Sequence, residues 1–256
     1  MLRSVKSFIN YVLEAEDGEI GRCKDLLFDD RQWVTRYMLA DTGKWLPGRK
    51  VLISPIALGE PDWVSQRLPV KMTQAQVENS PPLDADAPVS RKYEQLYFDH
   101  FGWPYYWTGG DLWGAMPYPP ATPVPLTEKG ESLKEEKEEL EETHLRSFKE
   151  VTGYYIEAID GEVGHAEDFI VDDTSWVFRY MVVDTRNWLP GRKVLIAPHW
   201  IEAVTWVENH VKVDLTVAAV KNSPEYDPSQ PVNREYEVLL YDYYGRPKYW
   251  EEPKVP

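Results

Sequence analysis

The chain has 256 residues, and 28 Lys and Arg against 43 Asp and Glu give it a formal net charge of -15 at pH 7. This charge argues against nucleic acid as a partner, because the basic residues are scattered among acidic ones instead of gathering in one stretch. The single cysteine excludes an intramolecular disulfide and a cysteine-rich metal site, and no apolar run approaches the roughly 18 residues of a spanning helix.

An internal repeat organises the chain. The nine residues at 45–53, Trp-Leu-Pro-Gly-Arg-Lys-Val-Leu-Ile, recur unchanged at 188–196, and the same shift aligns 2–107 with 145–250 without a gap. About half of the aligned positions are identical, which is typical of two copies of one fold. We therefore expect a first domain at 1–107, a linker at 108–143 and a second domain at 144–256.

The first copy begins with a predicted meander of three strands. The strands are expected at Phe8–Ala15, Ile20–Phe28 and Trp33–Ala40, where β-branched and aromatic residues are frequent. Asp17-Gly18 between the first two strands indicates a hairpin turn, in which Gly18 supplies the positive φ.

The next segment is expected to complete a small closed β-barrel. Trp45 and Leu46 follow a turn and are expected to cover one end of the sheet. Arg49–Ile53 predicts a fourth strand that stops before Pro55, and Asp62–Gln66 with Leu68–Met72 predicts a last strand pair. Short strands at this spacing favour a barrel, because closure removes exposed edges.

Two helices are predicted to follow the strands of each copy. Thr73 and Gln76 have the spacing of a capping box for a short helix through Val77. Ser90 is placed to cap a second helix, which ends at Gly102 before an aromatic tail at 103–107. In the second copy we predict a strand at Trp206–Val213 and the last helix at Arg234–Tyr244.

The segment between the copies contains two different compositions. Residues 108–125 are too rich in Gly and Pro for a regular element. Residues 128–142 are dominated by Glu and Lys, which favours a solvated helix over a coiled-coil seam, because Leu133 and Leu140 are too few for a heptad pattern.

No motif predicts catalysis or a cofactor. The pairs Asp29-Asp30 and Asp172-Asp173 are interpreted as turn residues, since calcium needs about six or seven oxygen ligands. The five histidines show no paired zinc spacing, and no phosphate loop, nucleophile elbow or Cys/His pair is present in the sequence. We expect no enzyme activity, no metal and no cofactor.

Aromatic side chains are the candidate interaction residues. They serve either for partner binding or for packing between the repeats, and a role in the core is favoured over recognition because helices on a barrel need apolar cover. The candidates are Trp45, Trp188, Trp103, Trp107, Tyr249 and Trp250.

The sequence resembles the PRC-barrel family, whose members include the barrel of the photosynthetic reaction centre H subunit. The resemblance covers about residues 8–71 and 151–214. It rests on Asp17–Gly21, Asp25–Asp29, Arg36–Asp41 and Arg49–Pro55, and on their repetition at Asp160–Gly164, Asp168–Asp172, Arg179–Asp184 and Arg192–Pro198. It implies two small, highly twisted β-barrels and a prokaryotic origin. The family supplies no catalytic motif, and neither quinone-side proton delivery nor ribosome binding is carried over.

These observations predict a mainly β protein with two tandem PRC-type barrels, each followed by short helices. A pseudo-two-fold is expected to relate the repeats as an internal dimer, since the isologous contact is the commonest way to join identical surfaces. The expected function is a cytoplasmic protein-interaction or scaffold module with an unidentified protein partner, which also allows homo-oligomers. The alternative is a small-ligand-binding protein that uses the barrels or the aromatic tails.

Overall fold

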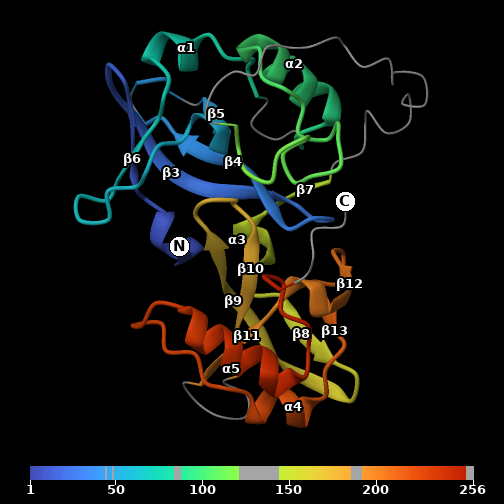
Figure 1. Cartoon of the computed structure of the whole chain (residues 1–256). Helices are drawn as coiled ribbons and strands as arrows, with labels where there is room; N and C mark the ends of the chain where they lie inside the picture. The colour runs from blue at the N-terminus through green and yellow to red at the C-terminus, as the bar shows by residue number, and fades with distance from the viewer. Residues whose placement is uncertain (44, 48, 84–87, 121–143, 186–191, 252–256) are drawn as a thin grey trace. The chain divides into compact units, whose positions relative to one another are not determined.

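The computed structural model describes residues 1–43, 45–47, 49–83, 88–120, 144–185 and 192–251. The chain forms two compact units, each with its own mixed β-sheet (Figure 1). The first unit contains Ser7–Lys149 and Thr174–Val177, and the second contains Met1–Lys6, Glu150–Asp173 and Phe178–Pro256. The borders of the units therefore differ from those of the sequence repeats, because each unit includes a segment of the other repeat.

The sheet of the first unit has the strand order β5-β4-β3-β2-β6. Its strands are β2 Val12–Ala15, β3 Gly18–Asp29, β4 Val34–Asp41, β5 Lys50–Ile53 and β6 Arg67–Pro69. The antiparallel pairing of β2, β3 and β4 confirms the predicted meander, and β6 runs parallel to β2. β3 is the longest strand of this unit, with 12 residues. It pairs with β2 on one side and β4 on the other, and β6 and β5 follow outside them.

The sheet of the second unit has the order β11-β10-β9-β8-β13-β12. Its strands are β8 Tyr155–Ala158, β9 Gly161–Asp172, β10 Phe178–Asp184, β11 Lys193–Ile196, β12 Ile201–Thr205 and β13 His210–Val213. β13 runs parallel to β8, as β6 does to β2, so the order from β11 to β13 matches the order from β5 to β6. β12 extends the second sheet by one strand that pairs with β13.

A short strand from the start of each repeat is added to the sheet of the other repeat. β1, Leu2–Ser4, pairs antiparallel with β9, and β7, Leu145–Ser147, pairs antiparallel with β3. Neither strand is predicted from the sequence.

Neither sheet closes into the expected barrel, since the strand orders of the described residues run open from β5 to β6 and from β11 to β12. The chain leaves β5 and enters a 3-10 turn, Pro55–Ala57, in which Ser54 accepts a hydrogen bond from the Ile56 N–H. Proline has no N–H for a ladder, so β5 cannot continue toward a closing partner. The turn Pro198–Trp200 interrupts the second repeat after β11 in the same way.

The helices agree closely with the sequence prediction, except for the short helix at Phe148–Val151, which was not predicted. They are α1 Gln74–Glu78, α2 Arg91–Phe101, α3 Phe148–Val151, α4 Val217–Asn222 and α5 Arg234–Tyr244, and a 3-10 turn at Val5–Phe8 corresponds to α3. The capping box of Thr73 and Gln76 is confirmed, and so is the Ser90 cap of α2. Gly102, at φ 65°, ends α2 in the left-handed conformation. In the first unit α1 and α2 lie together beside the sheet (Figure 1).

The strand predicted at Leu68–Met72 is shortened to β6, Arg67–Pro69. Three further strand predictions are wrong in whole or in part, and a change of backbone direction explains each of them. Phe8 belongs to the 3-10 turn, and Asn10 has φ 73°, so the strand begins only at Val12. Asp62–Gln66 forms a turn whose N–H groups bond to the Asp62 carboxylate. Trp206–Val213 divides into a turn and β13, because Asn209 has φ 58°.

Residues 108–120, predicted as part of the linker, form no helix or strand but are packed against the first unit. Trp113 is only 2 % exposed, and its Nε1–H donates to the Ser175 carbonyl oxygen at 3.0 Å. The helix expected at 128–142 lies outside the described residues.

Candidate functional site

Glu94 of α2 is the centre of a buried network of side chains, the first polar cluster, which consists of Arg36, Tyr37, Arg91, Glu94 and Tyr106. The phenol groups of Tyr37 and Tyr106 both donate to Glu94 Oε1, at 3.0 and 2.6 Å. Arg91 Nη1 lies 2.9 Å from Glu94 Oε2 and 3.0 Å from the Tyr106 hydroxyl. The cluster therefore joins β4, α2 and the segment after α2.

The two arginines of this cluster also lie over aromatic rings. The guanidinium carbon of Arg36 is 3.8 Å from the centre of the Tyr106 ring, and that of Arg91 is 4.3 Å from the Trp107 ring. Arg36 Nη1 donates to the Leu112 carbonyl oxygen at 2.6 Å. These contacts hold the aromatic tail and the following segment on the sheet.

The second repeat contains the same arrangement. This second polar cluster consists of Arg179, Tyr180, Arg234, Glu237 and Tyr249, all identical to the residues at the aligned positions. Tyr180 and Tyr249 donate to Glu237 Oε1 at 2.7 and 2.9 Å, and Arg234 Nη1 lies 3.0 Å from Glu237 Oε2. The guanidinium carbon of Arg179 is 4.2 Å from the Tyr249 ring centre. The cluster is thus a property of the repeat.

His144 distinguishes the first cluster from the second. Its Nε2 atom lies 2.9 Å from the Tyr106 hydroxyl and 3.5 Å from Glu94 Oε2, and the residue is 7 % exposed. Met1 stands at the aligned position of the first repeat, so the second cluster has no corresponding imidazole.

The pKa values of Glu94 and His144 move in opposite directions. Burial raises the pKa of Glu94 to about 7, against the opposing effects of Arg91 and of the hydrogen bonds from two tyrosines. Burial, and then the charge of Arg91, lowers the pKa of His144 to about 4, and Asp29 opposes this shift in part. Folding therefore favours a proton on Glu94 and disfavours one on His144.

We expect His144→Gln to make stability more dependent on pH. The raised pKa of Glu94 contributes stability below its unfolded value of 4.5, and this is lost as the pH rises through about 7. The lowered pKa of His144 contributes stability above 6.5, which is lost as the pH falls through about 4, so the two slopes oppose each other between these values.

Without His144, the Glu94 slope of up to about 1.4 kcal/mol per pH unit remains. Urea unfolding between pH 4.5 and 7 should show a falling free energy of unfolding for H144Q and a flatter profile for the parent. His100→Gln, at an exposed position of α2, is the control. Parallel profiles for H144Q and the parent would contradict the expectation.

The geometry of the polar cluster assigns it a structural role. Shifted pKa values often mark catalytic sites, but a catalytic carboxyl must reach its substrate, and Glu94 is 0 % exposed. Its Oε1 atom accepts from two phenol groups, and its Oε2 atom forms an ion pair with the Arg91 guanidinium.

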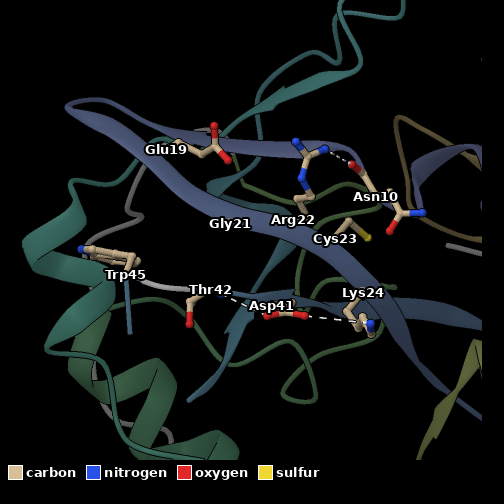
Figure 2. Close-up of a pocket in the computed structure, with 10 residues that line it drawn as sticks. Asn10, Glu19, Gly21, Arg22, Cys23, Lys24, Asp41, Thr42 and Trp45 are labelled. Atoms are coloured by element: carbon tan, nitrogen blue, oxygen red, sulfur yellow. Dashed lines mark hydrogen bonds and ion pairs between the residues drawn. The ribbon is translucent and has the colours of Figure 1, made fainter. Parts of the chain in front are cut away.

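A cleft with a volume of about 380 Å³ lies at the surface of the first unit, beside β3 and the end of β4. It is lined by Asn10, Glu19, Gly21, Arg22, Cys23, Lys24, Asp41, Thr42, Gly43 and Trp45. Figure 2 shows Trp45 at one end of the cleft and Asn10 with Lys24 at the other. Gly21, at φ 134°, is required here because a Cβ would meet the Asp41 carbonyl oxygen.

The cleft is lined by charges of both signs, and its two basic side chains already have partners. Arg22 donates to the Asn10 carbonyl oxygen at 3.0 Å, and Lys24 Nζ lies 3.9 Å from Asp41 Oδ2 (Figure 2). Cys23 is 0 % exposed, and burial raises the pKa of its thiol well above the ordinary value, so it is not a nucleophile at neutral pH. The cleft offers hydrogen-bonding groups and one indole, which suit a small polar ligand better than catalysis.

The predicted aromatic candidates fall into three groups. Trp45 is half-buried in the cleft, and Trp188 lies outside the described residues. Trp103 is 8 % exposed and stacks on Phe101 of α2 in its own repeat, with ring centres 4.7 Å apart. Its side chain thus belongs to the core.

The remaining candidates, Trp107, Tyr249 and Trp250, also contact their own repeats. Trp107 lies under Arg91, Tyr249 belongs to the second polar cluster, and Trp250 lies 4.1 Å from the guanidinium carbon of Arg234. Their predicted role between repeats stays a prediction.

Sequence reasoning missed the polar clusters. The available signal was the identity of both repeats at an Arg–Glu pair three residues apart, Arg91 with Glu94, and at the later Tyr-Trp pair, Tyr106 with Trp107. This combination of charged and aromatic identities indicates a shared buried contact.

The aspartate pair Asp29-Asp30 acts at a turn, as predicted. Asp29 Oδ1 accepts from the N–H groups of Arg31 and Gln32, at 2.9 and 3.0 Å, and Asp30 Oδ2 lies 3.0 Å from Arg146 Nε. Within the described ranges, no group of three or more His, Cys, Asp or Glu side chains is arranged to hold a metal ion.

Comparison with known proteins gives no family assignment. No protein-family model matches the chain, and no curated protein matches it.

In the part of the chain that the structure describes, no helix is long and apolar enough to cross a membrane.

Proposed function

We propose that the chain is a non-enzymatic protein-interaction or scaffold module. The observation that carries this proposal is a pair of apolar surface positions that recur in both repeats. Val64 and Val207, at aligned positions, are 96 % and 94 % exposed, and Leu96 and Leu239, also aligned, are 55 % and 56 % exposed. About half of the aligned positions differ between the repeats, so an exposed apolar residue at the same position in both favours a role in recognition.

Val64 and Val207 each lie in a turn that is packed on an aromatic side chain of the same repeat. In the first repeat, Trp63 packs on Phe8 with ring centres 5.3 Å apart, and the Asp62 carboxylate accepts the Val64 N–H at 2.9 Å. In the second, Trp206 packs on Tyr154 at 6.2 Å. A rigid turn loses little conformational entropy on binding, which favours a protein partner with an apolar pocket.

The proposal includes the relationship to the PRC-barrel family. The matching order of five strands in each sheet and the long strands β3 and β9, with register shifts in their pairing, support two copies of such a domain, here with open strand orders. The pseudo-two-fold relation of the repeats and their packing as an internal dimer belong to the same proposal.

A small-ligand-binding protein is the second candidate, and the cleft beside Trp45 favours it. A volume of about 380 Å³ lies within the range of small-molecule sites. A thermal-shift screen with metabolites, quinones and divalent metals tests this function directly, since a ligand for the folded state raises the midpoint of unfolding.

We expect the double variant V64S/V207S to lose a specific protein partner without losing stability, because both side chains are almost fully exposed. Wild-type and variant proteins, immobilised at equal density, are compared by quantitative mass spectrometry of the proteins they retain from the source organism. A partner should be depleted several-fold on the variant, because burial of a valine side chain at an interface contributes about 1.5–3 kcal/mol.

The matched control is S65T/E208Q, which changes the neighbouring exposed positions of the same turns and keeps a hydroxyl that can donate to Asp62. Equal retention by wild type and V64S/V207S, together with a metabolite that raises the unfolding midpoint, would replace the interaction proposal with the ligand-binding one.

A further inference from the structure

The two exchanged strands occupy equivalent positions on their sheets. β1 pairs Leu2 with Asp172 and Ser4 with Ile170. β7 pairs Leu145 with Asp29, and its Ser147 with Leu27, the residues at the aligned positions. Both strands have the sequence Leu-Arg-Ser, so the same three residues meet the same edge in both units.

An aspartate in each acceptor strand recognises the donor segment. Asp168 of β9 accepts hydrogen bonds from the Ser4 hydroxyl and from the Lys6 N–H, the latter at 3.1 Å. At the aligned position of β3, Asp25 accepts from the Ser147 hydroxyl and from the Lys149 N–H, the latter at 3.2 Å.

These aspartates are nearly inaccessible to water. Asp25 is 7 % exposed and Asp168 is 8 % exposed. Each carboxylate keeps one donor of its own strand, the N–H of Leu26 or Phe169. Its other hydrogen bonds come from the occupant, and a buried carboxylate that loses them is costly, so each acceptor strand favours an occupant that supplies a hydroxyl and an N–H two residues apart.

Charge adds a second element of recognition. Arg3 Nε lies 3.6 Å from Asp173 Oδ2, and Arg146 Nε lies 3.0 Å from Asp30 Oδ2. Each acceptor site is therefore the end of β9 or β3 that lies beyond the residues paired with β8 or β2, with two aspartates beside it. Its preferred occupant is an extended segment of the form Leu-Arg-Ser-x-Lys.

We propose that a second copy of this chain can supply that segment, so that two chains associate by exchanging their Leu-Arg-Ser strands. The donor segment of a second copy makes the same ladder and the same serine-to-aspartate hydrogen bonds as the chain's own segment. The exchange thus changes no contact within the units, and chain concentration decides between the closed monomer and the exchanged dimer. The exchanged segments do not include Val64 or Val207, so the exchange does not depend on the proposed recognition positions.

Cross-linking of full-length chains tests the exchange. Leu2 and Asp172 are direct partners and both half-buried, so cysteines at these positions can form a cross-strand disulfide. One chain carries L2C and the other D172C. Both carry C23A, because Ala166 occupies the aligned buried position of the second repeat.

The two chains are mixed at high concentration, opened briefly with urea, returned to buffer and oxidised. We expect a disulfide-linked dimer at about tenfold or more above that from L2C mixed with S65C, because contact in the ladder raises the effective concentration of the two thiols. The single chain L2C/D172C shows the same cross-link within a monomer, and L145C with D29C repeats the measurement at the β3 acceptor.

Light scattering of the parent chain after the same urea cycle is the second measurement. A dimer by mass together with either specific cross-link supports the exchange. A parent chain that stays monomeric overturns the proposal, and so does a dimer in which neither cysteine pair cross-links above the S65C control, since association then uses another surface.

Discussion

Replacing Glu94 with alanine should lower the free energy of unfolding by about 3–5 kcal/mol, the usual cost of breaking a buried ion pair by removing one partner. Glu94 accepts hydrogen bonds from Tyr37 and Tyr106 and pairs with Arg91 at 2.9 Å. All three partners would remain in the first unit without their acceptor. Urea unfolding, followed by tryptophan fluorescence, measures the loss.

The second repeat provides a matched control. Glu237→Ala removes the same carboxylate, but the Arg234 side chain is 53 % exposed, whereas that of Arg91 is 18 % exposed. Water can therefore solvate Arg234 after the substitution, and a smaller loss of about 1–3 kcal/mol is expected from the two phenols that lose their acceptor.

Equal losses of unfolding free energy for E94A and E237A would show that the burial of the paired arginine does not determine the cost of removing the glutamate. A loss below about 1 kcal/mol for E94A, which is the scale of an exposed ion pair, would show that the first polar cluster does not hold α2 and the aromatic tail on the sheet.

The elements predicted correctly from sequence are those with local signals. α1 and α2 begin at side chains that satisfy their own backbone, Thr73 and Ser90, and α2 ends at Gly102 for the same local reason. The repeat also transferred each prediction to the second copy, so that α5 was predicted with its observed bounds, Arg234–Tyr244.

The strands that were missed or misplaced depend on distant partners. β1 and β7 have three residues each, too few for a period to be visible. They exist because one end of β9 and one end of β3 extend beyond their pairing with β8 and β2. The Trp206–Val213 segment has strand-like composition, but the left-handed residue Asn209 reverses the chain inside it.

The polar clusters were beyond prediction for a similar reason. Glu94 looks like a surface residue of an amphipathic helix until Tyr37, far away in sequence, and the tail residue Tyr106 are seen to cover it. Burial by such long-range contacts leaves no periodic signal. The aromatic tails were predicted as a feature, but the arginines that lie over their rings, Arg91 and Arg234, were not.

The largest effect is expected when the repeats are separated. A fragment of residues 1–120 lacks Phe148 and Trp176, which are 3 % and 4 % exposed in the first unit. It also lacks β7 and the backbone hydrogen bond from the Thr35 N–H to the Trp176 carbonyl oxygen, 2.8 Å long.

Burial of two such side chains contributes about 2–3 kcal/mol each, a large share of the 5–15 kcal/mol that stabilises a typical domain. At low concentration the fragment 1–120 should therefore show no cooperative unfolding transition, as measured by circular dichroism and tryptophan fluorescence in urea.

The fragment 144–256, which lacks β1 and its hydrogen bonds to Asp168, should also be less stable than the same residues in the full chain. An equimolar mixture should restore a cooperative transition, because each fragment carries the strand that the other one needs. At high concentration, the fragment 1–120 alone should form a dimer, since its own Leu2–Ser4 can occupy the β3 edge of a second fragment. If the fragment 1–120 instead unfolds as a monomer at the midpoint of the parent chain, the exchanged strands do not couple the repeats, and each repeat is an independent domain.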